Sequence, residues 1–391
     1  MAFRQRLDSS FYASVQHQLQ ARLDDEQLDG IVLDHPDDVA YLTGFFHHPC
    51  ERPVAVYVGR DGSTVLLVPE LEREHAEWQQ AAAELVTYPE YPGVVEPLCA
   101  LAQAVPTPRR AGVGASMSIA RLQLLRQAFP CTTVVPSDIV ADTRLVKHPQ
   151  EIALHQEAGR ITDVMLEAGL ELVRAAVRAG GELPSEAELA AHVGGVGTRT
   201  MYAEHEDVVV LHFLAGGLVY AGPNSARPHG LPSGYRLRPG DAFMLSLGCA
   251  VGGRFVEGER TFLLGEPSAE QVRYYEAVRA AQQLGTDTLR PGLTCAESNA
   301  LCLDVIRDAG LGQYLQHRQG HGIGVSMHEP PWLEDGDPTV LREGFVVSNE
   351  PGLYIPGHAG YRISDSMQIT ADGAVPFTHF PKDLDDIIVD V

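Results

Sequence analysis

The sequence predicts two domains, an N-terminal α/β domain over residues 1–146 and a C-terminal α+β domain over residues 147–391. A chain of 391 residues is long for a single domain. Short apolar strands alternate with helical patterns before Arg144, whereas long helices and paired strands follow it. The segment Lys147-His148-Pro149-Gln150 lies where the two patterns meet and is the predicted boundary.

In the N-terminal half, short apolar runs predict strands, and two of these runs flank the hairpin signal Gly59-Arg60-Asp61-Gly62. Apolar residues at helical spacing predict helices. The predicted strands are 30–33, 54–58 and 64–68, and the predicted helices are 11–25, 70–80 and 119–128. Together these elements predict a mixed sheet packed against helices.

The C-terminal half is predicted to begin with a long helix over residues 149–179. A later helix starts with a capping box, in which Glu297 follows Thr294 by three residues. The acidic tail 382–391 is expected to be a solvated edge. The other predicted helices are 185–194, 269–289 and 295–309, and the predicted strands are 208–214, 242–249, 255–264, 345–349 and 362–369.

Composition and charge exclude several classes of function. The formal net charge of −23 and the lack of a Lys/Arg run argue against nucleic acid and anionic membranes as partners. No apolar run reaches the roughly 18 residues that span a bilayer, and no secretory signal is visible. The six cysteines form no C-x-x-C pair and are expected to be buried, reduced thiols. A cytoplasmic protein is therefore expected.

Three histidines within twelve residues form the most informative cluster: His317, His321 and His328. His321 has glycine on both sides, which allows backbone or ligand to approach closely. A histidine of this kind, taken alone, is equally explained as a satisfied core residue in a turn. Three of them so close together are hard to explain by packing and indicate a site.

Carboxylates interrupt two apolar strands. Glu350 ends the run Phe345–Asn349, and Glu257 and Glu259 lie on the strand that continues into Arg260. Because buried carboxylates are paired or coordinate a ligand, these residues are candidates for the same site. The alternatives are an exposed strand end for Glu350 and a simple ion pair between Glu259 and Arg260.

His229 lies in the Pro/Gly-flanked loop Pro228-His229-Gly230. As the only titratable group of a rigid loop, it is a candidate general acid or base. The alternative is an ordinary loop histidine.

Taken in order, these segments resemble the pita-bread superfamily (peptidase family M24), which includes prolidase, aminopeptidase P, methionine aminopeptidase and creatinase. The segment 37–45 also resembles the creatinase/prolidase N-terminal domain. The resemblance covers nearly the whole chain and implies a creatinase-like N-terminal α/β domain followed by a pita-bread domain. The C-terminal motifs that carry it are Asn224 to His229, Gly240-Asp241, Arg260-Thr261-Phe262, His321-Gly322-Ile323-Gly324, Asn349-Glu350-Pro351-Gly352 and Tyr361-Arg362-Ile363-Ser364-Asp365.

In the metallopeptidase members, five residues bind two divalent ions. The resemblance places these five positions on Ser246, Glu257, His321, Glu350 and Ser364. Two hydroxyls thus replace carboxylates that would screen two neighbouring dications, so a two-metal centre is not expected. The expectation is that no metal is bound. The alternative is a single zinc or manganese ion held by Glu257, His321 and Glu350.

Creatinase, the metal-free member, is similar in further detail. It likewise has serine at the position of Ser246 and Glu-Arg-Thr at the position of Glu259-Arg260-Thr261. The resemblance implies that His229 is catalytic and that Glu259 and Glu350 hold the substrate. It also implies that Arg52 reaches the substrate carboxylate of a neighbouring subunit, which requires a homodimer. Glu257, Ser364 and the prolidase-like loop after His328 depart from creatinase, so creatine itself is in doubt as the substrate.

The preferred hypothesis is a hydrolase that cleaves a C–N bond of a small, zwitterionic, amino-acid-derived substrate without a two-metal centre. The assigned roles are proton transfer by His229, binding or water orientation by Glu350 and Glu259, an alternative base in Glu257, and carboxylate binding by Arg52 and Arg362. One alternative is an Xaa-Pro dipeptidase or aminopeptidase P-like enzyme with one metal, in which His328 and Arg362 contact a dipeptide. The other is a binding module whose catalytic site has decayed.

Overall fold

The computed structural model describes residues 2–93 and 95–391, and the chain separates into two compact units. One unit comprises Arg6–Arg144 together with Val209–His212. The other comprises Leu145–Val208 and Phe213–Val391, together with the short N-terminal segment that ends at Gln5. No helix in the described part of the chain is long and apolar enough to span a bilayer.

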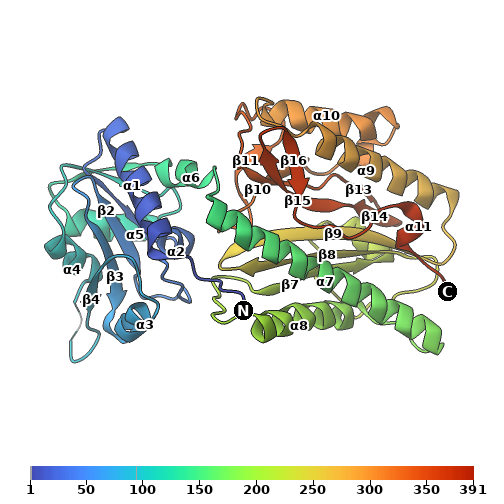
Figure 1. Cartoon of the computed structure of the whole chain (residues 1–391), viewed down its shortest axis with the longest axis horizontal. Helices are drawn as coiled ribbons and strands as arrows, with labels where there is room; N and C mark the ends of the chain where they lie inside the picture. Colours follow the sequence, from blue (N-terminus) through green and yellow to red (C-terminus); the bar gives the residue numbers. More distant parts are fainter. Residues whose placement is uncertain (1, 94) are drawn as a thin grey trace. The chain divides into compact units, whose positions relative to one another are not determined.

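The N-terminal unit is a six-stranded mixed sheet in the order β4-β3-β2-β1-β5-β6, drawn from blue to teal in Figure 1. Helices α4 and α5 pack on one of its faces through apolar residues such as Leu101 and Leu125, against Val32 and Tyr57. The strands are β1 (Gly30–Leu33), β2 (Ala55–Gly59), β3 (Thr64–Pro69), β4 (Glu84–Tyr88), β5 (Arg110–Val113) and β6 (Thr133–Pro136). The helices are α1 (Ser9–Asp25), α2 (Pro36–Thr43), α3 (Arg73–Trp78), α4 (Pro97–Ala104), α5 (Ile119–Ala128) and α6 (Ile139–Arg144).

The C-terminal unit is a nine-stranded sheet whose main order is β11-β10-β12-β15-β9-β8-β7, with β16 beside β15 and β17 beside β9 (Figure 1). The remaining strands, β13 and β14, form a separate antiparallel pair. The strands are β7 (Ala215–Ala221), β8 (Ala242–Val251), β9 (Arg254–Leu264), β10 (Gly320–Gly322), β11 (Glu329–Leu333), β12 (Val346–Asn349), β13 (Gly352–Ile355), β14 (Ala359–Arg362), β15 (Ser364–Thr370), β16 (Gly373–Pro376) and β17 (Ile388–Val389).

Five α-helices accompany this sheet in the described residues. The helices are α7 (Pro149–Ala179), α8 (Glu186–Glu204), α9 (Ala269–Thr288), α10 (Cys295–Asp308) and α11 (Leu384–Ile387). Helix α7 packs on β8 and β9, α8 on β7, and α10 on β11. Proline at its first turn and Gly180 at its C-cap, with φ of 60°, explain where α7 begins and ends. The predicted capping box of α10 is confirmed.

Two predictions of local structure, 208–214 and the tail, were wrong, and two others, 70–80 and 362–369, had inexact boundaries. Residues 208–214 form no strand, because Val209–His212 belongs to the N-terminal unit, where His212 Nε2 lies 2.6 Å from Asp37 Oδ1. Residues 70–80 contain a 3₁₀ turn before α3 rather than one helix, and 362–369 is divided between β14 and β15. The acidic tail is no simple solvated edge, since β17 pairs with β9 and Val389 is buried.

The cysteine prediction was also partly wrong. All six cysteines are free thiols, as expected, but Cys50 and Cys131 are exposed and Cys99 is only partly buried.

Candidate active site

Three adjacent strands place polar residues in one row across the sheet. Ser246 on β8 lies opposite Glu259 on β9, and Glu259 lies opposite Ser364, the first residue of β15. Because residues directly opposite each other in a sheet point to the same face, the row brings together residues more than a hundred positions apart. The Ser246 hydroxyl donates a short hydrogen bond to Glu259 Oε1.

Glu257 shares this face of β9 because it precedes Glu259 by two residues. Ser364 Oγ donates to Glu257 Oε1 at 3.1 Å. Gly258, between the two glutamates, faces the opposite side, where a Cβ would come 3.0 Å from Thr162 Cγ2 of α7. Glycine at this position therefore lets the strand carrying both glutamates lie close against the helix.

His321 lies on β10 between two glycines that close packing requires. A Cβ at Gly320 would lie 2.1 Å from the Ser348 carbonyl oxygen, and one at Gly322 would lie 2.3 Å from that of Pro330. His321 Nδ1 is 3.0 Å from the Gly322 carbonyl oxygen, so this nitrogen carries the proton of the neutral ring. Nε2 then faces the site, 3.2 Å from Glu350 Oε1 and 3.8 Å from Glu257 Oε2.

The protonation states of Glu257, His321 and Glu350 depend on one another. Burial and the nearby Glu350 charge raise the pKa of Glu257 to about 8. Burial disfavours a charged His321, yet the Glu257 and Glu350 carboxylates raise its pKa to about 9. Burial likewise opposes ionisation of Glu350, but the hydrogen bond and charge of His321 lower its pKa to about 2. Near neutral pH the metal-free cluster therefore favours an imidazolium at His321 beside an ionised Glu350, and Glu257 holds a proton more readily than an ordinary glutamate does.

Arg362, the last residue of β14, is buried and fully engaged. Its Nη2 donates to Glu259 Oε1 at 2.6 Å and to Ser246 Oγ at 3.0 Å, and its Nε forms a close ion pair with Glu259 Oε2. Its Nη1 donates to the Tyr354 hydroxyl at 3.0 Å. Tyr354 also lies 2.8 Å from His317 Nε2, so the network continues to the first of the three predicted histidines.

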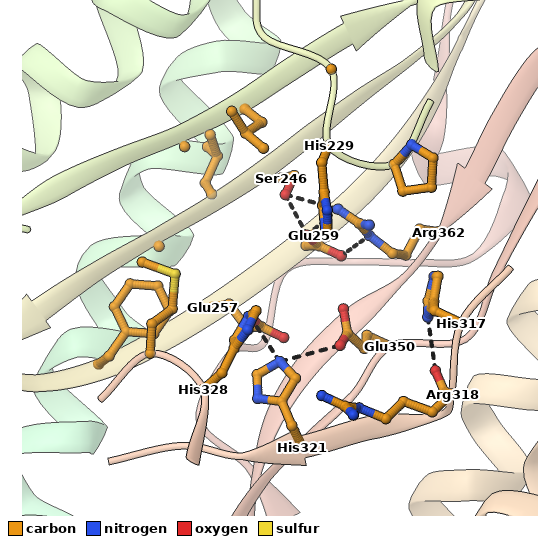
Figure 2. A pocket seen from close by; sticks show the side chains of 18 of the residues that line it. His229, Ser246, Glu257, Glu259, His317, Arg318, His321, His328, Glu350 and Arg362 are labelled. Carbon is orange, nitrogen blue, oxygen red and sulfur yellow. Dashed lines mark hydrogen bonds and ion pairs between the residues drawn. The ribbon is translucent and has the colours of Figure 1, made fainter. Parts of the chain in front are cut away.

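One cavity of about 1120 Å³ in the C-terminal unit is lined by Glu257, His321 and Glu350, together with Ser246, Glu259, His317 and Arg362 (Figure 2). His229 borders the cavity from its loop, and the His328 ring lies 4.0 Å from that of His321, measured between ring centroids. Burial and the His321 charge lower the pKa of His328 to about 4, so its ring is neutral at neutral pH. The fold thus brings most of the predicted C-terminal site residues together at this cavity: His229, Ser246, Glu257, Glu259, His321, His328, Glu350 and Arg362.

Two predicted residues lie elsewhere. Ser364 is fully buried behind the cavity, where it hydrogen-bonds Glu257. Arg52 belongs to the N-terminal unit and pairs with Glu51 and Glu90, so its role across a dimer interface stays a prediction. The alternative of an ion pair between Glu259 and Arg260 does not hold, because Arg260 pairs with Asp365 at 2.7 Å and Glu259 pairs with Arg362.

Sequence reasoning missed two contributors to the cavity region, Tyr354 and Arg318. Tyr354 lies on the small β13–β14 pair, which the sequence did not predict. Arg318 directly follows His317, and that position was its only signal.

Comparison with known proteins agrees with this architecture. The profile described as metallopeptidase family M24 matches residues 153–371, and that of the creatinase/prolidase N-terminal domain matches residues 16–146. The chain belongs to metallopeptidase family M24. Its fold is a creatinase-type N-terminal α/β domain followed by a pita-bread domain, and it is a hydrolase of this family.

Three M24 relatives extend over almost the full length. The chain is 32% identical over 378 residues to an Xaa-Pro dipeptidase of Lactobacillus delbrueckii subsp. lactis, covering 94% of this chain and 97% of the relative. It is 32% identical over 391 residues to a probable dipeptidase, PepE, of Mycobacterium bovis, covering 97% of each chain. The crystal structure of the prolidase from Pyrococcus horikoshii OT3 superposes with a TM-score of 0.82 at 26% identity, covering 95% of this chain and 99% of that one.

The M24 fold implies divalent metal, and the donor set of this chain does not fit two ions. Ser246 and Ser364 supply neutral hydroxyls at the two positions where the resemblance implies carboxylates. In addition, the Glu259 carboxylate on this side of the site is already paired with the Arg362 guanidinium, so its charge is not available to balance a second dication.

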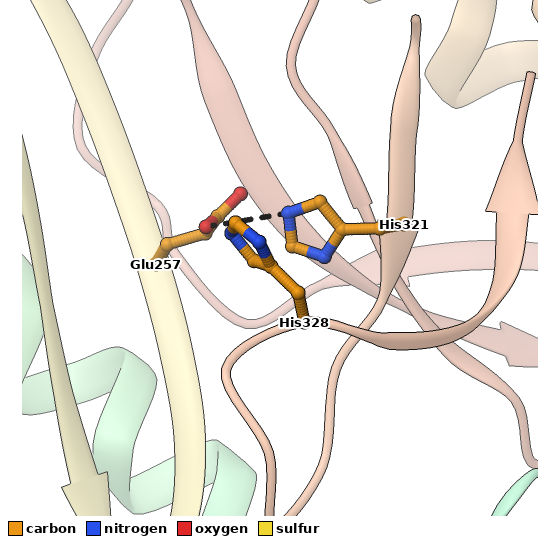
Figure 3. A group of neighbouring side chains, drawn as sticks. All are labelled: Glu257, His321 and His328. Carbon is orange, nitrogen blue, oxygen red and sulfur yellow. Dashed lines mark ion pairs between the residues drawn. The ribbon is translucent and has the colours of Figure 1, made fainter. Parts of the chain in front are cut away.

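The donor set does fit one ion. Glu257, His321 and His328 each offer a ligand atom, and these atoms lie within 4.8 Å of one another (Figure 3). A carboxylate with two imidazoles is a common set for catalytic zinc. The hydrogen bond at His321 Nδ1 leaves Nε2 free to serve as the ligand. This set differs from the one that the sequence suggested, since His328 takes the place of Glu350.

Proposed function

We propose that the protein is a dipeptidase that hydrolyses Xaa-Pro dipeptides with one bound zinc or manganese ion. The observation that carries the proposal is the cluster of Glu257, His321 and His328, whose ligand atoms lie within 4.8 Å of one another in the cavity that Glu350 and His229 also line. The similarity to Xaa-Pro dipeptidases over nearly the full length of the chain supports the same substrate class.

Glu257, His321 and His328 would hold the ion, which when bound supplies a Lewis acid for the scissile carbonyl group. Glu350 borders the same space and would orient the attacking water and accept its proton. His229, at the opposite loop, would donate a proton to the leaving nitrogen of proline. The Glu259–Arg362 pair would hold the Tyr354 hydroxyl and the β9 wall in a fixed geometry.

A second candidate is hydrolysis of a C–N bond in a small zwitterionic amino-acid derivative without metal. Three features favour this candidate: the neutral hydroxyls of Ser246 and Ser364 and the fixed Arg362 cation. With them the site carries less negative charge, so no metal ion is needed to neutralise it. Glu257 is the general base in this case, since a pKa of about 8 matches the working pH better than that of Glu350 does.

The deciding experiment measures metal content and activity together. Purified protein is dialysed with excess zinc or manganese and then without, analysed for metal, and assayed with Ala-Pro in the presence and absence of a chelator. The dipeptidase proposal expects about one ion per chain, lost in Glu257→Ala together with activity. Glu334→Gln, which changes a carboxylate on the cavity wall outside the cluster, is the matched control for metal content.

Ala-Pro hydrolysis that survives complete metal removal would overturn the single-ion mechanism and keep the dipeptidase. Protein that retains no metal and leaves Ala-Pro intact would favour the second candidate. Creatine-like, cyclic amidine and N-carbamoyl compounds would then be the substrates to assay.

A further inference from the structure

Arg318 is a cavity-lining cation that the proposed mechanism leaves without a role. Its guanidinium carbon lies 4.3 Å from the centroid of the Trp332 ring, and its Nη1 donates to Glu334 Oε2 at 2.6 Å. The side chain is 31% exposed. A guanidinium stacked on an aromatic ring and tied at one nitrogen is held in one plane, so little rotational entropy remains to be lost when an anion binds.

The sheet register places this cation beside the catalytic cluster. Trp332 on β11 lies directly opposite His321 on β10, and such partners have Cβ atoms roughly 4.5–5.5 Å apart. Arg318 therefore stacks on the cross-strand neighbour of His321. In Figure 2 its side chain extends from the backbone toward His321 and Glu350. Its positive charge is also one of the causes that lower the pKa of His328.

Arg318 and Arg362 differ in whether the Nε and Nη2 edge of the guanidinium is occupied by the chain's own groups. Arg362 uses Nε, Nη1 and Nη2 on Glu259, Tyr354 and Ser246. Across residues 2–93 and 95–391, Glu334 is the only hydrogen-bond acceptor found for the Arg318 guanidinium, and it takes Nη1 alone. The Nε and Nη2 edge is left, and this edge presents two parallel N–H groups, the arrangement that binds a carboxylate through both oxygens.

We propose that Arg318 binds the free C-terminal carboxylate of the substrate and thereby restricts the site to dipeptide-sized molecules that end there. In a dipeptide the carboxylate carbon is three bonds from the scissile carbonyl carbon. Arg318 stacks on Trp332, the cross-strand partner of His321. A carboxylate bound there would therefore place the scissile peptide bond close to the His321 cluster. The inference rests on the proposed function for the identity of the reaction, but the anion site itself can be tested without any turnover.

The kinetic test compares Ala-Pro with its C-terminal amide. Wild type is expected to favour Ala-Pro strongly. Arg318→Gln should raise KM for Ala-Pro about 10- to 100-fold, since hydrogen bonds to charged groups are lost, with kcat changed by less than about threefold and the amide unaffected. Arg318→Lys keeps the positive charge but loses the bidentate hydrogen bonds, so its KM for Ala-Pro should lie between those of wild type and Arg318→Gln. Equal losses on both substrates, or an unchanged preference, would overturn the proposal.

Arg342→Gln is the matched control. Arg342 also stacks on an aromatic ring, with its guanidinium carbon 5.2 Å from the Phe345 centroid, but it lies outside the cavity lining. It should leave the preference for Ala-Pro unchanged. Thermal unfolding of all three variants checks that they are folded.

A calorimetric test separates failure of the anchor from failure of the proposed function. N-acetyl-L-proline and N-acetyl-L-prolinamide are titrated into wild type, Arg318→Gln and Arg342→Gln. Binding of the acid but not the amide, lost only in Arg318→Gln, would support the anchor even if no dipeptide is hydrolysed. Equal binding of acid and amide, binding that survives Arg318→Gln, or no binding of the acid by wild type would overturn it even if Ala-Pro is a substrate.

Discussion

Arg362 donates to Glu259 across the centre of the site, from Nη2 to Oε1 at 2.6 Å, and both side chains are buried. The pair lies next to Ser246, one of the two positions at which the resemblance to M24 metallopeptidases implies a metal-binding carboxylate. The Arg362 guanidinium thus neutralises the Glu259 carboxylate, and this part of the site needs no metal ion to do so.

We predict that Glu259→Ala lowers the free energy of unfolding by about 3–5 kcal/mol, because it leaves the Arg362 charge buried without a partner. The double variant Glu259→Ala/Arg362→Met should be less destabilised than the sum of the two single variants by about 1–3 kcal/mol. Urea unfolding of the metal-free protein, followed by circular dichroism, measures this cycle. Strict additivity would mean that the pair contributes no coupling to stability.

The sequence predicted which residues belong to this site better than it predicted how they are arranged in space. Glu350 and Glu257 were identifiable because carboxylates interrupt strands that are otherwise apolar, and His321 because it lies between two glycines in a cluster of three histidines. The alignment of Ser246, Glu259 and Ser364 in one row depends on pairing between distant strands, which no local pattern encodes.

Local patterns also failed where tertiary packing decides the structure. The run 208–214 is apolar because Val209 and Leu211 are buried, although it joins no sheet. The tail looked solvated by composition, yet Ile387 and Val389 are buried and β17 pairs with β9. Arg318 gave no periodic signal, because the packing of Trp332 and Glu334 from another strand positions it.

If Ser246 and Ser364 occupy ligand positions, as the resemblance implies, carboxylates placed there should change how the site responds to metal. Ser246→Asp/Ser364→Glu adds two acids beside Glu257 and Glu350, so the metal-free variant should unfold at a lower temperature than wild type. Zinc or manganese should then raise its Tm more than that of wild type, because ions that bind only the folded state stabilise it. Ser246→Asn/Ser364→Gln, of similar size without charge, is the control. Equal metal-induced shifts in all three proteins would contradict this account of the site.

Acid sensitivity should arise partly at His155, far along the chain from the histidine cluster. The ring is fully buried, Nδ1 lies 2.9 Å from the Phe255 carbonyl oxygen, and burial together with the charges of Lys147 and Arg254 lowers its pKa to about 3. Below about pH 6.5 the unfolded chain binds a proton here that the folded chain excludes. Stability should therefore fall by up to about 1.4 kcal/mol per pH unit between pH 6.5 and 3 from this group.

His155→Asn keeps a donor for the Phe255 carbonyl group and removes the titration, so its unfolding free energy should depend less steeply on pH over that range. His17→Asn, an exposed histidine of α1, is the control and should keep the wild-type slope. Identical slopes in wild type and His155→Asn would show that other groups dominate the acid response.

We predict that His229 donates a proton to the leaving group and does not contribute to substrate binding. His229→Asn should lower kcat for Ala-Pro by about 10²- to 10⁴-fold, as expected when a general acid is removed, with little change in KM. A substrate whose leaving group departs as a stable anion, such as alanine p-nitrophenyl ester, should lose much less activity. A rise in KM without a fall in kcat would instead assign His229 to binding, and equal losses on ester and dipeptide would exclude it as the acid.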